Sequence, residues 1–445
     1  MPTSLPPGPY RHIRLSDGTD VPYYIIPFDK QGRCEGPETR KHLLESARTG
    51  GFTDVFLFSH GWNNDWTVAT GRYEDFIQGY MKMRQEHSLP VPAGYKPLLV
   101  GIFWPSTALV FSEGETGPGI AGADPAAVDA AVAEERQEVR EIAEALAPER
   151  VERFYELAQQ EALSEEEGLE LAGILQTLYR ANDEVDAAGE PTAKEILEAW
   201  KAAAAPAQDF SDPADFGTVG GGAGGPQAAG FGDVLRKLDP RQVVRVATVW
   251  QMKDRAGVVG ARGVGPLLRD LLQATPARVH LIGHSYGGKV VLSAVASAEL
   301  PRKVESILLL EPAVSHLCFA EKVPGTDRPG GYRPVLDRVN KPILSTFSAN
   351  DVPLTRVFHL AVRRAGDLGE AQIAGDGEPP SNFAALGGFG PRKAGEKLID
   401  IQDLPQRYDL TGARVYGLRA TRTISGHGDI SNPSTWWALY NLASV

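Results

Sequence analysis

The sequence predicts an α/β protein built on a mostly parallel sheet, with helices on both faces. Short apolar runs at 54–61, 97–106 and 279–282 alternate with segments of helical length. Strands that are apolar along their whole length are typical of a parallel sheet covered on both faces, because neither face meets water. With 445 residues, of which 42% are hydrophobic and 23% charged, the chain can bury a large core.

The first expected elements are two short strands, HIRLS and VPYYIIPF, which are separated by a turn at Asp17 and Gly18. A helix should follow in PETRKHLLESARTG, with Pro37 near its start and Gly50 at its end. The runs DVFLFSHG and PLLVGIFWPS then predict two buried strands on either side of a polar helical segment.

A segment of different character divides the predicted core into residues 1–111 and 233–445. This insertion, residues 112–232, is rich in Ala and Glu and has glycine-rich flanks. Between Ala121 and Lys201 there are 21 acidic and 7 basic residues, whereas the remainder has 36 and 38. So much negative charge argues against nucleic acid or an anionic membrane as a partner. We expect three or four helices there, acting as a cap or as a surface for a protein partner.

Local patterns support helices within the insertion. Capping-box signals occur at Ser164 to Glu167 and at Thr192 to Glu195. Apolar residues also recur at helical spacing, which predicts stripes that face a core; these are Ile142, Leu146, Leu157, Leu171, Leu175 and Leu178.

After the insertion, residues 241–273 are expected to form a helical connection rather than a strand. The segments SILLLEPA and KPILSTFSANDVPL then predict further strands, and the tail ARVYGLRATRTISGHGDI is expected to contain the last strand and a loop. A last helix is expected in NPSTWWALYNLAS, with Pro433 in its first turn.

The segment VHLIGHSYGG carries the clearest chemical signal. The strand 279–282 leads at once into Gly283-His284-Ser285-Tyr286-Gly287 and then into a helical segment, which is the context that a nucleophile elbow requires. The two glycines let strand and helix approach closely while the serine hydroxyl points outwards. We therefore predict that Ser285 is a nucleophile and that the neighbouring His284 points away from the position of a base.

A serine nucleophile needs a base, and the base needs an acid that orients it. On an elbow of this kind the chain order is serine, acid, histidine. Asp351 lies where a predicted strand ends, and His427 lies in the loop before the last helix. Glu311, at the end of the strand after the elbow helix, is an alternative acid, while His316 and His359 are alternative bases.

A tetrahedral intermediate also needs two backbone N–H donors. One is expected from Tyr286, which follows the nucleophile. The other is expected from Trp62 in the turn His60-Gly61-Trp62, which follows the strand 54–61.

Taken together, these segments resemble the α/β-hydrolase family. The resemblance covers roughly 50–110 and 240–445, through strand–HGW, strand–GHSYGG, strand–SANDVPL and strand–SGHGDI in that order. The chain is also similar to a bacterial subgroup with an HGxNxx turn and a later WPS, here His60 to Asp65 and Trp104 to Ser106. The resemblance implies a mostly parallel eight-stranded sheet, a triad at its carboxyl edge, and hydrolysis of an ester or related acyl group. The insertion after WPS departs from the family, where lids more often follow the strand after the elbow helix.

The sequence therefore predicts a serine hydrolase of the esterase or lipase type that acts on a small-molecule acyl ester. The alternatives are a thioesterase, amidase or peptidase with the same triad, or a non-catalytic scaffold that binds a protein through the insertion. No Cys/His ligand spacing appears, so no metal or cofactor is expected. The sequence has two cysteines and no signal-peptide pattern, which favours a cytoplasmic protein. It has no long apolar run, so no membrane span is expected.

Overall fold

The computed structural model describes residues 7–14, 20–62, 64, 66–106, 252–358 and 384–444, with most of 140–178 and part of 192–197. The glycine-rich flanks of the predicted insertion, the Thr192 to Glu195 capping signal as a whole, and His359 lie outside the described residues. The domain boundaries at 111 and 232 also lie outside them and stay predictions.

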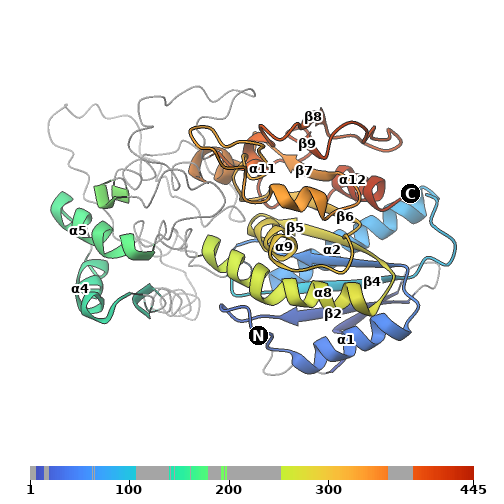
Figure 1. Ribbon diagram of the computed structural model, residues 1–445, viewed down its shortest axis with the longest axis horizontal. Coiled ribbons are helices and arrows are strands. Elements are labelled where there is room, and N and C mark those ends of the chain that lie inside the picture. The colour runs from blue at the N-terminus through green and yellow to red at the C-terminus, as the bar shows by residue number, and fades with distance from the viewer. Residues whose placement is uncertain are drawn as a thin grey trace, which may run out of the picture.

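The protein is of the α/β class, with nine strands in one sheet (Figure 1). The strands are β1 (Arg11–Arg14), β2 (Asp20–Pro27), β3 (Asp54–Ser59), β4 (Pro97–Phe103), β5 (Arg278–His284), β6 (Ser306–Leu310), β7 (Ile343–Phe347), β8 (Lys397–Asp400) and β9 (Val415–Arg419). The described helices that flank the sheet are α1 (Pro37–Thr49), α2 (Trp66–Glu86), α8 (Gly265–Ala274), α9 (Tyr286–Ser297), α11 (Leu386–Phe389) and α12 (Pro433–Ala443).

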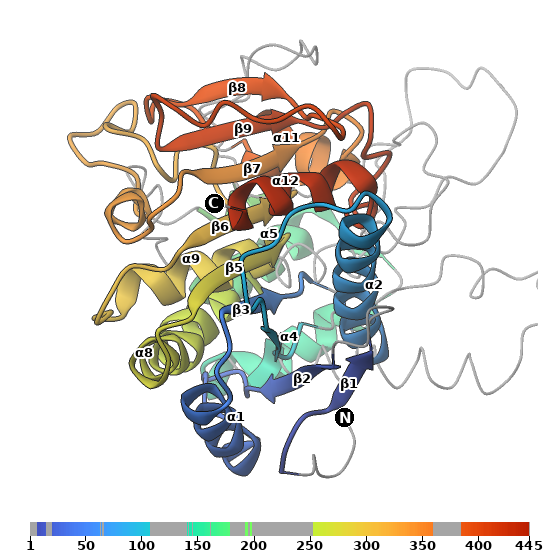
Figure 2. The same cartoon turned by 90° about the vertical axis from the view of Figure 1, so that its right-hand side faces the viewer.

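The strand order is β1-β2-β4-β3-β5-β6-β7-β9-β8. Figure 2 shows β8 at the top of the sheet and β1 and β2 near the bottom. β1 pairs with β2 antiparallel, and all the other pairs are parallel. After β3 the chain moves outwards to β4, and after β5 it moves in the opposite direction to β6. The carboxyl ends of β3 and β5 therefore flank a topological switch point, where open parallel sheets bind their ligands.

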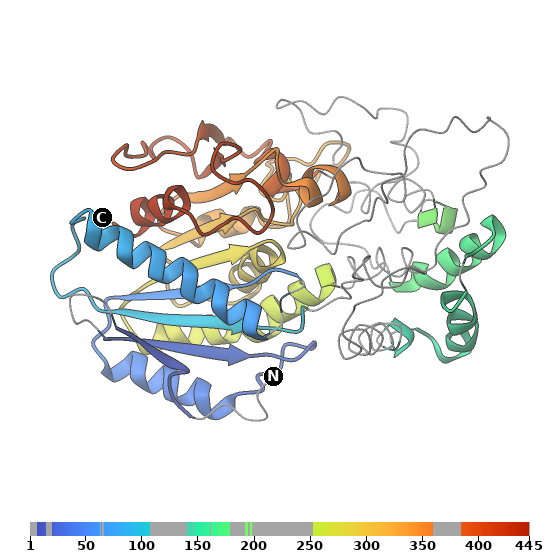
Figure 3. The same ribbon diagram turned by 180° about the vertical axis from the view of Figure 1, so that it is seen from behind.

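Two helical layers cover the sheet. On one face α1 contacts α8, and α8 contacts α9, while on the other face α2 contacts α12. Figures 1 and 3 show these layers from opposite sides. Within β3, Val55 and Leu57 belong to the first core, and Phe56 and Phe58 to the second. Both faces of the strand are buried, which explains its unbroken apolar run.

The sequence predictions for the core elements are confirmed, except at one edge of the sheet. The Pro433 prediction is confirmed, because this proline begins α12 and Asn432 caps it. The connection before β5 is helical over its described part, with a π-helical turn at Val259–Val264. The sheet has nine strands rather than about eight because β8 was missed. Its four residues are half-exposed or exposed and lack the long apolar run that marks the central strands.

Part of the insertion is described as two helices, α4 (Pro148–Ala158) and α5 (Glu165–Leu175). They lie at one end of the long axis of the molecule in Figures 1 and 3. The capping box at Ser164 and Glu167 is present. The stripe residues whose side chains are described are all buried, as predicted; they are Ile142, Leu146, Leu157, Leu171 and Leu175. Within the described part of the chain, no helix combines the length and the apolar character that crossing a membrane requires.

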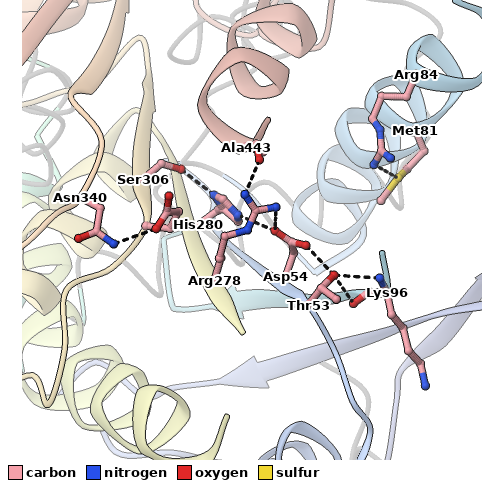
Figure 4. A network of polar contacts seen from close by, with 11 residues as sticks. Thr53, Asp54, Met81, Arg84, Lys96, Arg278, His280, Ser306, Asn340 and Ala443 are labelled. Carbon is pink, nitrogen blue, oxygen red and sulfur yellow. Dashed lines mark hydrogen bonds and ion pairs between the residues drawn. The ribbon is translucent and has the colours of Figure 1, made fainter. Parts of the chain in front are cut away.

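A buried polar network ties the amino ends of the central strands to the C-terminal helix (Figure 4). Asp54 accepts hydrogen bonds from His280 (3.0 Å) and Thr53 (2.7 Å) and forms an ion pair with Arg278 (2.7 Å). Arg278 also donates to the carbonyl of Ala443, the last residue of α12, at 2.9 Å. The Asp54 and His280 side chains are fully buried, so both depend on partners within this network for their hydrogen bonds.

Replacing Asp54 with Ala should lower the free energy of unfolding by about 3–5 kcal/mol, because buried partners lose their acceptor. Urea denaturation followed by tryptophan fluorescence measures this change. The control is Glu45→Ala, which removes an ion pair with Arg48. The Glu45 side chain is 59% exposed and the Arg48 side chain 61% exposed. That variant should unfold like the wild type, and an equal loss in both variants would refute the stabilising role of the network.

The loss caused by Asp54→Ala should also depend on pH. Burial works to raise the pKa of Asp54, but the bonds from His280 and Thr53 and the Arg278 charge outweigh it, so the pKa lies below its usual value. A carboxyl with a lowered folded-state pKa stabilises above its unfolded pKa of about 4 and loses that contribution as the pH falls. The difference in the free energy of unfolding between wild type and Asp54→Ala should therefore become smaller below about pH 4.

Candidate active site

Ser285 lies in a strained turn between β5 and α9. Its backbone has φ 53° and ψ −124°, a conformation that L-residues rarely adopt. The turn is held by hydrogen bonds from the Ser285 N–H to the carbonyl of Leu310 (3.1 Å) and from the Gly288 N–H to the carbonyl of Ser285 (3.0 Å). Such a backbone costs about 1–3 kcal/mol and persists where the surrounding structure enforces it, often at functional sites.

Glycines are required on three sides of this turn. A Cβ on Gly283 would lie 2.6 Å from the carbonyl oxygen of Gly287, and one on Gly287 would lie 2.1 Å from that of Ser59 in β3. A Cβ on Gly61, in the turn after β3, would lie 2.6 Å from the Cβ of Ser285. The backbone after β3 is therefore in direct contact with the serine.

The structure brings Ser285, His427 and Asp351 into one hydrogen-bonded series. His427 Nε2 lies 2.9 Å from Ser285 Oγ, and His427 Nδ1 lies 2.7 Å from Asp351 Oδ2. The other carboxylate oxygen of Asp351 accepts the N–H of Leu354 at 2.9 Å. All three side chains are buried. An imidazole with its Nδ1–H on a carboxylate presents Nε2 to the hydroxyl as an acceptor.

Loops at the carboxyl ends of the strands supply these residues. Ser285 follows β5, Asp351 follows β7, and His427 lies between β9 and α12. The alternative acid Glu311 follows β6 directly and is fully buried. Among the described hydrogen bonds, Asp351 rather than Glu311 receives the His427 ring. Burial and the adjacent Asp351 carboxylate hold the pKa of Glu311 well above its usual range.

His284 contacts the candidate base. Its Nε2–H donates to the backbone carbonyl of His427 at 2.9 Å, and the two ring centroids are 5.0 Å apart. Burial, with a further contribution from His427, lowers the pKa of His284 well below its usual value, so the ring is neutral. The sequence interpretation placed His284 away from the base, but its ring supports the loop that carries His427.

A second set of contacts holds the turn after β3. The His60 ring stacks on Trp104 with a centroid distance of 5.4 Å and an interplanar angle of 7°. Its Nδ1–H donates to the carbonyl of Gly61 (2.8 Å), and its Nε2 accepts the backbone N–H of Trp104 (3.2 Å). Burial lowers the pKa of His60 to about 4, so the ring is neutral near pH 7 and Nε2 can accept.

Asn64 and Ser106 complete this clamp. The Asn64 side chain donates to the carbonyls of Gly61 (3.1 Å) and Trp62 (2.6 Å). The Ser106 hydroxyl accepts the Asn64 N–H (3.3 Å) and donates to the Asn64 carbonyl (3.2 Å). Sequence analysis singled out the HGxNxx and WPS strings but assigned no role to Asn64 or Ser106. The signal that could have found this clamp was the occurrence of the two strings at the carboxyl ends of two buried strands. β3 and β4 are neighbours in the sheet, and their parallel pairing brings the two strings together.

The two predicted oxyanion donors lie on either side of Ser285. Tyr286 is the first residue of α9, where backbone N–H groups have no acceptor within the helix. Trp62 follows Gly61, and its ring lies 6.5 Å from that of Tyr286. The placement of both residues suits the expected role, which stays a prediction.

The alternative bases are not part of this arrangement in the described structure. The ring of His316 is buried and donates to the carbonyl of Ala384 at 2.8 Å, and burial lowers its pKa to about 4. His359 is outside the described residues.

A second Ser–His–Asp series occurs at the amino ends of the central strands, opposite the carboxyl ends that carry the candidate site. His280 Nδ1 lies 2.8 Å from Ser306 Oγ, and Nε2 lies 3.0 Å from Asp54, within the network of Figure 4. Ser306 is buried in the first position of β6 with regular strand pairing, and Asp54 also binds Arg278. The two series contain the same three residue types, but the ring nitrogens exchange partners, and the backbone and surroundings differ. The Ser306 series therefore provides an internal control.

Gly61→Ala should destabilise the protein by about 1–3 kcal/mol, because the new methyl group would overlap the Ser285 side chain. The matched control is Gly71→Ala in α2, where a Cβ meets nothing within 4 Å. That change should stabilise the helix by about 0.5–1 kcal/mol. Urea denaturation of both variants measures the difference, and changes of the same sign would contradict the close contact.

Among the described residues, no group of three or more His, Cys, Asp or Glu side chains is arranged to hold a metal ion. No family model, curated protein or solved structure matches this chain. The arrangement of the described residues is therefore the evidence on which a function rests.

Proposed function

We propose that this chain is a serine hydrolase of the α/β-hydrolase type that cleaves a carboxylic ester through an acyl-enzyme. The observation that carries the proposal is the series from Ser285 through His427 to Asp351, centred on a strained turn. A serine hydroxyl becomes nucleophilic when a neutral imidazole takes its proton and a carboxylate stabilises the imidazolium that forms.

In the first half-reaction Ser285 Oγ bonds to the acyl carbon while its proton passes to His427 Nε2. The C–O bond to the alcohol then breaks, and His427 returns the proton to the leaving oxygen. In the second half a water attacks the acyl-serine and gives its proton to His427. When the carboxylic acid leaves, that proton returns to Ser285 Oγ. Asp351 holds the imidazole in the required tautomer throughout.

We assign stabilisation of the tetrahedral oxyanion to the backbone N–H groups of Trp62 and Tyr286. Two observations support this: the turn after β3 touches Ser285 at Gly61, and His60 and Asn64 clamp that turn. A donor fixed before the reaction needs no reorganisation when charge develops, and losing one such donor typically raises the barrier by about 3 kcal/mol.

The fold supports the same conclusion. The elbow, the acid and the histidine follow β5, β7 and β9 at one edge of a mostly parallel sheet, an order compatible with an α/β-hydrolase. β4 also ends at this edge, so the insertion leaves the core beside the switch point. We propose that the insertion forms a cap over the site.

The leaving group is best identified with small chromogenic substrates. A panel of p-nitrophenyl esters of increasing acyl length, with matched thioesters and anilides, compares the candidate reactions directly. We expect esters to be cleaved fastest. A clear preference for thioesters or anilides would place the chain among thioesterases or amidases with the same triad.

Ser285→Ala should abolish labelling by a fluorophosphonate probe and reduce ester turnover to the residual level, because it removes the nucleophilic oxygen. Ser306→Ala is the matched control, since Ser306 is also bonded to a histidine in a Ser–His–Asp series. That variant should label as the wild type does. Labelling that survives Ser285→Ala, or a wild type that neither labels nor turns over, would instead favour a non-catalytic scaffold.

Asp351→Asn should lower kcat by about four orders of magnitude, because the amide favours the wrong imidazole tautomer. Glu311→Gln should lower kcat by less than about tenfold, since Glu311 does not receive the His427 ring. Steady-state kinetics on p-nitrophenyl acetate compare the two variants. A larger loss in Glu311→Gln would move the role of the acid from Asp351 to Glu311.

A further inference from the structure

Glu311 is a buried acid that the proposed mechanism leaves without a role. It follows the last residue of β6, has no exposed surface, and has a φ of 43°. The described non-glycine residues with positive φ are Ser88, Ser285, Glu311 and Lys393. Two of these four lie at the ends of the adjacent strands β5 and β6, beside the candidate site. Strain at a fully buried acid requires surroundings that enforce it.

Those surroundings come from β7 and α11. The Glu311 N–H donates to Thr346 Oγ1 at 2.9 Å. Gly387 packs so closely that a Cβ there would lie 2.4 Å from the carbonyl carbon of Glu311. Gly387 also donates to the carbonyl of Pro312 and accepts the N–H of Ser348, both at 3.0 Å. The backbone at Glu311 is therefore fixed on both sides, and its side chain is held against the loop that carries Asp351.

The Glu311 carboxyl lies within hydrogen-bonding reach of the Asp351 carboxyl. Two carboxyl groups form a hydrogen bond only when one of them carries a proton. Asp351 accepts N–H donors on both oxygens, from Leu354 and His427, which stabilises its ionised form. The Thr346 hydroxyl and the Ser348 N–H act to lower the pKa of Glu311, but burial and the Asp351 charge outweigh them. Neither carboxyl oxygen of Glu311 has a hydrogen bond of good geometry among the described residues, so the proton belongs on Glu311.

We propose that Glu311 is a positioning residue that stays protonated at neutral pH and donates its proton to the Asp351 carboxylate, as the fourth member of the Ser285–His427–Asp351 series. This inference rests on the proposed hydrolase function for its catalytic consequence. Burial, followed by the Asp351 charge, raises the pKa of Glu311 well above its usual range, in agreement with this assignment.

A neutral donor changes the chemistry of the base. By sharing the charge of Asp351, Glu311 weakens the stabilisation of the His427 imidazolium that forms during proton transfer. The charged group that faces Glu311 from the β7 side is Asp351, and His427 lies beyond it. The other neighbours named above, Thr346 in β7 and Gly387 in α11, are uncharged. Among the described neighbours, it is the Asp351–His427 pair that links Glu311 to catalysis.

The first test is the pH profile of kcat/KM for p-nitrophenyl acetate. Glu311→Met keeps most of the side-chain volume but removes the donor, so the acidic limb should move to higher pH. At the acidic end of the profile, kcat/KM of Glu311→Met should be about three- to tenfold below that of the wild type, with KM little changed. Glu311→Gln retains an N–H donor and should keep its limb close to that of the wild type. The control is Glu305→Gln, immediately before β6, where the acid is half-exposed and accepts from Asn340.

The second test needs no enzymatic activity. A buried acid with a raised pKa loses stability as the pH rises, because the unfolded chain releases its proton above about pH 4.3 while the folded protein keeps it. The folding equilibrium constant of the wild type should therefore fall relative to Glu311→Gln by up to about tenfold per pH unit from pH 5 upwards. Relative to Glu305→Gln no such trend is expected. Urea denaturation of the three proteins between pH 5 and 8 measures both ratios.

The two tests separate the two proposals. If the wild type neither labels nor hydrolyses esters, the hydrolase function fails, and the stability ratio still decides where the proton lies. A ratio between wild type and Glu311→Gln that is constant with pH overturns the proton assignment. An acidic limb that stays in place in Glu311→Met, in an active enzyme, overturns the positioning role. A merely structural role would change the stability of Glu311→Met without moving that limb.

Discussion

The candidate site depends on one close contact between backbones, where the carboxyl end of β3 meets the first turn of α9. Gly287 lies so near the carbonyls of Ser59 and His60 that no side chain fits, and Gly61 lies against Ser285. This contact places the turn after β3 beside the elbow. The register of β3 with β5 fixes where along the elbow that turn lies. The hydroxyl, the histidine loop and the expected oxyanion donors all take their positions from it.

That contact is possible because the two helical layers hold the strained turns in place. Ser285 and Glu311 each adopt a backbone that costs about 1–3 kcal/mol. On one side α9 is buried along almost its whole length, and on the other the side chains of α2 and α12 pack against the sheet. A single fully buried Leu or Val contributes about 1.5–3 kcal/mol, so a few such side chains offset the strain. The site is therefore rigid because the core around it is rigid.

What the sequence predicted, and what it did not, follows from the range of each interaction. Local patterns predicted the strand–turn–helix at Ser285, the α12 helix with Pro433 in its first turn, and most strands, since each is encoded within a few residues. The half-exposed β8 left no such pattern, so the strand count was too low. The contact of His284 with the His427 carbonyl joins residues far apart in the chain. Such contacts depend on strand order, which hydrophobic periodicity does not encode, and so they were missed.

Under the proposed function, the two Ser–His–Asp series differ in features that their hydrogen bonds alone do not describe. At Ser306 the backbone is regular strand, and part of the Asp54 charge is used by Arg278, so an imidazolium at His280 would gain little. At Ser285 the strained turn presents the hydroxyl at the switch point, and among the described ion pairs Asp351 has only His427. The difference lies in the backbone and the second partner of each acid rather than in residue identity. Parallel strands place the Ser306 series at their amino ends and the Ser285 series at their carboxyl ends. Only the carboxyl ends have the turn after β3, to which we assign an oxyanion donor.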